Sequence, residues 1–508
     1  MYSKVNTCVL QGLDGWNVEV ETDLSRGIPV FNIVGLPDIS IRESKERVRS
    51  AIKNSGFEFP LNRITINLAP ANLKKEGSQI DLAIAVGILK SAGVIKDYDT
   101  DDLTFIGELS LDGKVNAIEG SLAMVISMRQ LEKLTCILPY DNKEECGAIE
   151  GIDIIPVKNL KELVAFLNDE IHIKAYKKEI KESSEEIVHN IDFSDIKGQS
   201  GLKRALEIAA SGFHNCLIIG PPGAGKTMAA RRIPTIMPNL TFEESIEVTK
   251  IYSISGLLPS NELIQTRQFR SPHHTASEIS LIGGGRMPKP GEVSLSHNGV
   301  LFLDELPEFK KSVLEVLRQP LEDGFVTISR SKASLTFPSQ FMLIASMNPC
   351  PCGYLGDPYH QCTCSQSNID RYLGKISNPL LDRIDIHIEV SPVKYDDLKQ
   401  SGKEESSSEI RKRVHRARDI QLDRFEHLDI YSNSQILPND LNKYCRLDKN
   451  SESIMNQAFK KYNFTGRTYN KLLKVSRTIA DLDGEKNIRE NHLLEAIRYR
   501  TLDSKYWG

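Results

Sequence analysis

The sequence has no long hydrophobic run. No stretch of its 508 residues approaches the roughly 20 apolar residues that a membrane-spanning helix requires. The N-terminal residues MYSKVNTCVLQGLDG lack the charged head and apolar core of a secretory signal. The sequence also lacks a repeat of fixed period, which argues against a repeat architecture. We therefore expect a cytoplasmic protein with no membrane partner.

A strong net charge is missing as well. The 64 basic and 68 acidic residues give −4, which neither indicates nor excludes a polyanionic partner, because binding depends on local basic patches. Hydrophobic residues at 40% and charged residues at 26% are typical of a globular protein, and the length predicts two or three domains. The nine cysteines should be reduced in the cytoplasm, so a close group of them indicates metal ligands or buried thiols.

Changes in composition divide the chain into four parts. Residues 1–167 mix short apolar runs with helical patterns, which predicts an α/β domain. Residues 168–190 are rich in Lys, Glu and Ser and predict a linker. Residues 191–395 alternate buried strands with helices, which predicts a layered α/β domain with a parallel sheet. Residues 396–508 have helical periodicity and predict a helical subdomain.

A glycine-rich loop follows the apolar run Cys216–Ile219 and leads into a helix. Its residues are Gly220, Pro221, Pro222, Gly223, Ala224, Gly225, Lys226 and Thr227. Backbone N–H groups of such a loop surround phosphate oxygens, Lys226 reaches the β- and γ-phosphates, and Thr227 binds Mg²⁺. The strand–loop–helix context predicts a site for ATP and Mg²⁺, with a glycine turn that matches by chance as the alternative.

Polar residues follow two further apolar runs. Val300–Leu303 ends in Asp304 and Glu305. We expect Asp304 to hold Mg²⁺ through water and Glu305 to orient and polarise the attacking water, although such a pair alone is equally typical of a helix cap. The run FMLIAS leads to Asn348, which we expect to contact the γ-phosphate or the water; an isolated asparagine would indicate a turn.

The motifs GPPGAGKT, LFLDEL, ASMNPCPCG, PLLDRID and SPHHTAS together resemble the ComM/YifB family of magnesium-chelatase-like AAA+ ATPases. The resemblance covers nearly the whole chain. It implies a central AAA+ P-loop NTPase parallel sheet, a C-terminal helical lid and a hexameric ring, in which an arginine of one subunit completes the site of its neighbour.

This resemblance assigns roles to two arginines. Arg383 is the finger toward the adjacent γ-phosphate, where it would stabilise charge in the transition state. The alternative for Arg383 is a surface ion pair with Asp382 or Asp385. Arg467 matches the arginine by which the lid senses nucleotide, although Arg477 could serve instead.

The family also implies insertions around the core, at residues 271–296 and in a hairpin. The alternating strands Phe325–Arg330 and Ala333–Phe337 flank a short turn, which predicts a hairpin that displays Arg330 and Lys332 at its tip. In related ring helicases such a hairpin faces the central pore and grips DNA phosphates. Two solvated charges on a surface hairpin are the alternative.

Four cysteines follow Asn348 closely. Cys350, Cys352, Cys362 and Cys364 form the pattern C-x-C-x9-C-x-C, and four thiolates at this spacing can converge on one tetrahedral Zn²⁺ with a structural role. Reduced loop thiols are the alternative, and His360 could replace one ligand.

The N-terminal segments LKKEGSQIDLAIAVGIL and GELSLDGKVNAIEGSLAM resemble the proteolytic domain of Lon. A working site there needs a serine nucleophile and a lysine base. When the glycines are aligned, these positions hold Gln79 and Leu122, and Ser78 lies one place away from the nucleophile position. We predict a catalytically degenerate Lon-protease-like scaffold or interaction module.

These observations predict an ATPase that works as a ring motor. The ATPase prediction follows from the residues. The resemblance implies a homo-hexamer acting on single-stranded or branched DNA, as a helicase or branch-migration factor in homologous recombination and natural transformation. One alternative is a chelatase-like motor for metal insertion, which the Lon-like domain and the cysteines disfavour. Another is an ATP-dependent Lon-like peptidase, which Gln79 and Leu122 disfavour.

Overall fold

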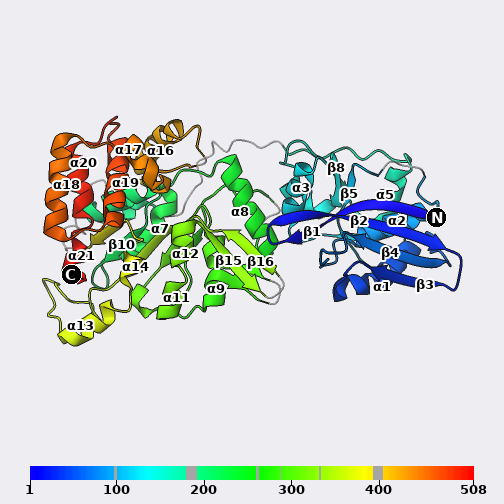
Figure 1. The fold of residues 1–508 in the computed structure, drawn as a ribbon, viewed down its shortest axis with the longest axis horizontal. Coiled ribbons are helices and arrows are strands. Elements are labelled where there is room, and N and C mark those ends of the chain that lie inside the picture. The colour runs from blue at the N-terminus through cyan, green and yellow to red at the C-terminus, as the bar shows by residue number, and fades with distance from the viewer. Residues whose placement is uncertain are drawn as a thin grey trace. The chain divides into compact units, whose positions relative to one another are not determined.

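A computed structural model describes residues 1–96, 100–178, 191–258, 262–285, 288–330, 333–392, 404–428 and 430–507 (Figure 1). The chain forms two compact units. One comprises residues 1–184 with 245–264, and the other comprises residues 185–244 with 265–508. The predicted linker, 168–190, is described only up to residue 178, and within that part Tyr176 pairs with Ile154.

The first unit is built on a seven-stranded mixed sheet of order β3-β4-β2-β1-β5-β8-β9. Its two longest strands, β1 and β2, form an antiparallel hairpin, and Gly12 with a φ of 65° suits the tight turn between them. From β1 outward, β5, β8 and β9 run parallel. The strands are β1 (Tyr2–Gln11), β2 (Asp14–Ser25), β3 (Val30–Val34), β4 (Arg63–Ala69), β5 (Leu103–Phe105), β8 (Thr135–Pro139) and β9 (Asp153–Val157), with the short pair β6 (Glu108–Leu109) and β7 (Val115–Asn116) beside them.

Helices cover this sheet. Helix α2 packs on β1 and β2 and buries nearly every side chain, which explains its almost continuous apolar sequence. The helices are α1 (Ile39–Asn54), α2 (Asp81–Ser91), α3 (Ser121–Gln130), α4 (Lys143–Cys146), α5 (Leu160–Leu167) and most of α8 (Phe242–Ser255). On α8, the Ser253 hydroxyl donates to buried Glu145 at 3.0 Å, so a segment distant in sequence completes this unit.

The second unit contains a five-stranded parallel sheet of order β11-β14-β17-β10-β18. Its strands are β10 (Cys216–Ile219), β11 (Phe269–Arg270), β14 (Val300–Leu303), β17 (Met342–Met347) and β18 (Ile386–Glu389). The parallel α/β sheet is therefore confirmed. The first strand in sequence, β10, lies between the fourth and the fifth, and ligands of such sheets bind where the order reverses, beyond the carboxyl ends of the strands.

Short elements surround the sheet. Strands β15 (Phe325–Arg330) and β16 (Ala333–Pro338) pair antiparallel, as predicted for the hairpin, while Lys332, which was predicted at its tip, lies outside the described residues. The other elements are α6 (Ser200–Gly212), α7 (Lys226–Arg232), α9 (Glu278–Ile282), β12 (Gly283–Gly284), β13 (Lys289–Pro290), α10 (Glu292–Leu295), α11 (Lys311–Glu315), α12 (Arg318–Asp323), α13 (Gln366–Leu373) and α14 (Asn378–Leu381).

The C-terminal region is helical, as predicted. It contains α16 (Ser407–Arg424), α17 (Leu441–Tyr444), α18 (Lys449–Tyr462), α19 (Gly466–Leu482), α20 (Glu490–Arg498) and α21 (Leu502–Tyr506). Ser406 and Glu409 cap α16 reciprocally, which fixes where this helix begins. Helix α19 packs on α6, α16 and α20, so the lid shares its apolar core with the sheet domain. Among the described residues, no helix is both long and apolar enough to cross a membrane.

Candidate functional site

The glycine-rich loop connects the end of β10 to the start of α7 at Lys226. Gly223 and Gly225 have φ angles of 77° and 83°, in the left-handed region that glycine adopts most readily. The first backbone N–H groups of a helix have no partner within it, and together with the helix dipole they attract anions. This geometry fits a loop that wraps around phosphate oxygens.

The ammonium group of Lys226 is folded back over this loop. Its Nζ donates to the backbone oxygens of Gly220 and Pro221 at 2.7 and 2.9 Å and to Asn348 Oδ1 at 3.0 Å. Burial lowers the pKa of Lys226 to about 8, although nearby Asp304 and Glu305 oppose the shift. The predicted lysine and the predicted asparagine are therefore in direct contact.

The carboxylate of Asp304 lies beside Thr227. The hydroxyl of Thr227 donates to Asp304 Oδ2 at 2.8 Å, Ser346 Oγ donates to the other carboxylate oxygen, and the backbone N–H of Glu305 donates to that same oxygen at 3.1 Å. Hydroxyl and carboxylate oxygens are the ligands that Mg²⁺ prefers. Thr227 and Asp304 would hold that ion, either directly or through water.

Glu305 directly follows Asp304 and is the more exposed of the two. Its φ of 53° turns the chain sharply after β14, and 58% of its side chain is exposed. His274 of the SPHHTAS motif lies beside it, with Nδ1 3.9 Å from Glu305 Oε2. An exposed carboxylate at this sheet edge can accept a proton from water.

Arg383 is held on a different set of partners. Its guanidinium donates to Arg318 O at 3.1 Å, to Pro379 O at 2.7 Å and to the carboxylate of Glu322. Arg467 lies 3.7 Å from the same carboxylate. Burial, together with nearby Arg467 and Arg318, lowers the pKa of Arg383, so three guanidinium groups gather here.

Two alternatives from the sequence, Asp385 as a partner of Arg383 and Arg477 as the sensor, have other partners in the structure. Asp385, whose side chain is 11% exposed, pairs with Lys471 of α19 at 3.0 Å and lies 3.4 Å from His214. Arg477, the alternative sensor, is buried inside the lid, where it pairs with Asp481 at 3.1 Å. Of the two sensor candidates, Arg467 is the accessible one, with 59% of its side chain exposed.

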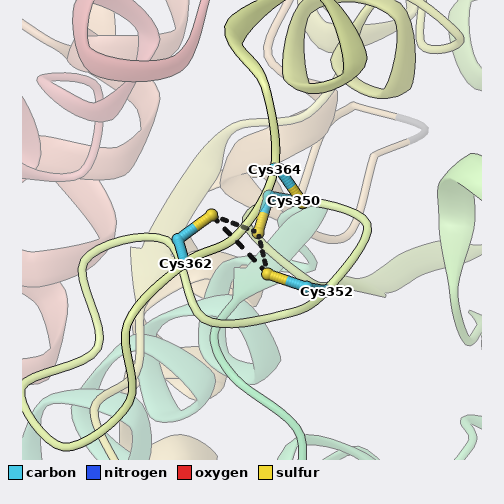
Figure 2. A group of neighbouring side chains, drawn as sticks. All are labelled: Cys350, Cys352, Cys362 and Cys364. Atoms are coloured by element: carbon cyan, nitrogen blue, oxygen red, sulfur yellow. Dashed lines mark hydrogen bonds between the residues drawn. The ribbon is translucent and has the colours of Figure 1, made fainter.

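The four cysteines of the loop after β17 form one group. Their sulfur atoms all lie within 4.8 Å of one another, and Figure 2 shows the sulfurs of Cys350, Cys352 and Cys362 facing each other. His360 is not part of this group, because its side chain is 65% exposed and its Nδ1 lies 3.4 Å from Asp357. The geometry therefore favours four thiol ligands over three thiols and a histidine.

The Lon-like positions in the first unit have no catalytic pair. Gln79 donates to the backbone oxygen of Glu76 at 2.8 Å, and Leu122 is buried in an apolar cluster. The hydroxyl of Ser78 donates to Glu108. A buried leucine cannot act as the base that a serine nucleophile would need.

Sequence reasoning assigned no role to several residues near these sites. Ser346 lies in β17, two positions before Asn348, which follows the strand, and the alternation of side chains along a strand could have placed the Ser346 hydroxyl near Asp304. His274 belongs to the SPHHTAS motif, but the motif gave this residue no role. Glu322 and Arg318 gave no local signal, because only the tertiary fold brings them to Arg383.

Comparisons with known proteins agree with these motifs. The family model described as magnesium chelatase, subunit ChlI, matches residues 192–398, and the model of the ChlI C-terminal part matches residues 404–500. A further model, described as subunit ChlI of Mg-chelatase, matches residues 20–142.

Full-length relatives resemble the chain more closely. The competence protein ComM of Haemophilus influenzae is 41% identical over 492 residues, covering 96% of this chain and 94% of the relative. YifB of Escherichia coli is 39% identical and covers 99% and 97%. The magnesium-chelatase 38 kDa subunit of Rhodobacter capsulatus is 25% identical over only 31% of this chain. The chain belongs to the ComM/YifB family of magnesium-chelatase-like AAA+ ATPases.

Proposed function

We propose that this protein is an ATP-hydrolysing ring motor that moves along or remodels DNA. The observation that carries the ATPase part is the convergence of Lys226, Asn348, Thr227 and Asp304 at the carboxyl edge of the parallel sheet. These groups come from three separate segments, namely the loop with Lys226 and Thr227, the end of β14 with Asp304, and the end of β17 with Asn348, and all meet at one place.

Each residue has a definite part in this proposal. The loop and Lys226 bind the triphosphate, and Thr227 and Asp304 hold Mg²⁺, which supplies charge neutralisation. Glu305 orients the attacking water and accepts its proton. Asn348, which accepts a hydrogen bond from Lys226 in this structure, positions the γ-phosphate or the water. In-line attack then needs only positioning and electrostatic stabilisation.

The arginine cluster supports a ring. Arg383 and Arg467 share Glu322, whereas Lys226 is bonded to its own loop and to Asn348. An arginine supplied by one subunit can stabilise the charge that develops at the γ-phosphate of its neighbour. We propose a homo-hexamer in which Arg383 acts as the finger and Arg467 senses the nucleotide.

A DNA client is supported by the full-length relative that is named a competence protein. On this basis we propose branch migration or helicase activity in homologous recombination during natural transformation. The chelatase alternative is weaker, since the Rhodobacter capsulatus chelatase subunit is 25% identical over only 31% of this chain, whereas the competence protein is 41% identical over 96% of it. The peptidase alternative is weakened by Leu122, which is buried where a lysine base is required.

One assay separates these functions. The ATPase rate is measured without DNA and with single-stranded, duplex and branched DNA, alongside casein and porphyrin controls. Stimulation by DNA, strongest with the branched substrate, is expected. A turnover and an oligomeric state that DNA leaves unchanged would eliminate the helicase proposal.

The hairpin offers a more specific prediction. Replacing Arg330 and Lys332 together by alanine should weaken DNA binding and flatten its dependence on salt, because each lost phosphate contact removes about one released counterion. Basal ATPase activity should persist. Fluorescence anisotropy with labelled DNA at several salt concentrations measures the effect, and normal binding at every concentration would show that the hairpin does not contact DNA.

Nucleotide binding should also depend on pH through Lys226. In the free protein its pKa is lowered to about 8, whereas bound phosphates favour the ammonium and raise it. At pH 7 the lysine is already charged, but at pH 9 a proton must be taken up on binding. The affinity for ATP should therefore fall about tenfold from pH 7 to pH 9.

Calorimetry in two buffers of different ionisation enthalpy measures this proton uptake. Lys226→Arg is the control, since its guanidinium stays charged and its affinity should vary little over the same range. A flat pH profile for the unmodified protein would contradict the assignment of Lys226.

The proposed cofactors are ATP and Mg²⁺ at the phosphate loop and Zn²⁺ in the cysteine group.

A further inference from the structure

The geometry of the cysteine group suits a metal ion better than disulfides. Cys350 Sγ lies 3.4 Å from Cys352 Sγ and 3.6 Å from Cys362 Sγ, and Cys352 Sγ lies 3.5 Å from Cys362 Sγ (Figure 2). A disulfide needs about 2.05 Å between sulfurs. Tetrahedral Zn²⁺ with bonds of about 2.3 Å places its sulfurs about 3.8 Å apart. With Cys364 within 4.8 Å of the others, the group offers four thiolates to one ion.

The loop that carries these cysteines lies directly on the phosphate loop. Gly353 follows Cys352 with a φ of 86°, and a Cβ added there would lie 2.6 Å from Pro222 Cδ. Only glycine permits so close an approach. The position of Pro222 therefore depends on where the cysteine loop lies.

A second connection runs through the sensor. Asn348, whose side chain holds Lys226, lies two residues before Cys350. Its backbone N–H bonds to the phenol oxygen of Tyr372, and Tyr372 belongs to α13, which begins two residues after Cys364. The cysteine loop is therefore connected to Asn348 at both ends, through the chain before Cys350 and through Tyr372 after Cys364.

Residues 350–364 contain no helix or strand, so ordering them costs conformational entropy, against which this loop has only turn hydrogen bonds such as Gly353 N–H to Cys350 O and Asp357 N–H to Tyr354 O. A metal cross-link between the two C-x-C pairs removes most of this cost. We infer that Zn²⁺ held by the four cysteines fixes this loop against Pro222 and Asn348, and thereby sets the affinity of the phosphate loop for ATP. This inference rests on the proposed ATPase.

The test uses the full-length protein. Zinc content is measured by mass spectrometry, and Co²⁺ replaces zinc so that the intensities of the thiolate-to-cobalt and d–d bands report a tetrahedral four-sulfur site. We expect one ion per chain. Cys362→Ser should lose the ion, whereas His360→Ala, in the same loop, should keep it.

ATP affinity is then measured with a fluorescent nucleotide in Mg²⁺ buffer. Metal-free protein should bind about tenfold more weakly, because small displacements of a phosphate-binding group are costly. Added Zn²⁺ should restore the affinity of the unmodified chain but not of Cys362→Ser. Circular dichroism of the metal-free chain checks that its fold is retained, so that weak binding is not a loss of folding.

The outcomes are distinct. Absence of a bound ion, or a cobalt spectrum without sulfur ligands, would overturn the metal site. One ion per chain with an ATP affinity that does not change on its removal would overturn the coupling. If the zinc-loaded chain bound no ATP, the proposed ATPase would fail, while the cobalt spectrum would still decide the metal site.

Discussion

Glu305→Gln should lower kcat for ATP hydrolysis by about 10² to 10⁴ and leave ATP binding nearly unchanged. The amide keeps the volume of the carboxylate but cannot accept a proton from the attacking water. Binding should survive because the side chain of Glu305 is exposed, and the contacts between Thr227, Ser346 and Asp304 do not involve it. Steady-state ATPase rates and a fluorescent-nucleotide titration measure the two quantities separately.

Glu308→Gln provides the matched control. Glu308 lies three residues further along, in the turn that follows, and its carboxylate lies 3.5 Å from exposed Lys375. The change removes the same charge nearby without touching the proposed water site, so the rate should stay close to that of the unmodified protein. Equal rates for the two variants would remove Glu305 from its assigned role.

His274 lies beside Glu305, with its imidazole Nδ1 3.9 Å from the carboxylate. The sequence could supply the histidine, because SPHHTAS is a recognisable motif. The sequence does not predict the distance between His274 and Glu305, because 30 residues separate them along the chain.

Local patterns explain what could be predicted. The strands β10 and β14 and the hairpin pair β15–β16 are short segments whose apolar or alternating sequence is sufficient to define them. The phosphate loop is similar, because its glycines and Lys226 are contiguous. Lys226 meets Asn348 because the carboxyl ends of adjacent parallel strands meet at one edge.

Long-range pairing explains what could not be predicted. For Arg383 the sequence suggested its neighbours Asp382 and Asp385 as partners, yet the guanidinium bonds to Glu322, about 60 residues earlier. Asp385 instead pairs with Lys471 of the lid, so proximity in sequence was misleading. Likewise, nothing local indicates that residues 245–264 would pack with the N-terminal unit.

Arg383→Ala should lower kcat by about 10³ while leaving ATP binding intact, because the guanidinium stabilises charge that develops only in the transition state. Glu322→Gln is the control. It breaks the ion pair that Arg383 makes within its own subunit but leaves the guanidinium in place. If Arg383 is merely one half of an ion pair, the two variants should be equally impaired. If it is a finger, Glu322→Gln should retain most of its activity.

Mixed rings test whether the finger serves a neighbour. Arg383→Ala subunits keep Glu305, and Glu305→Gln subunits keep Arg383, so an interface between the two in one orientation contains both groups. Mixing two nearly inactive preparations, after dissociation and reassembly, should therefore restore a measurable fraction of the ATPase rate. If each active site used residues of one subunit only, mixing could not restore activity. A mixture that is as inactive as its two components would show that Arg383 does not act in the site of the adjacent subunit.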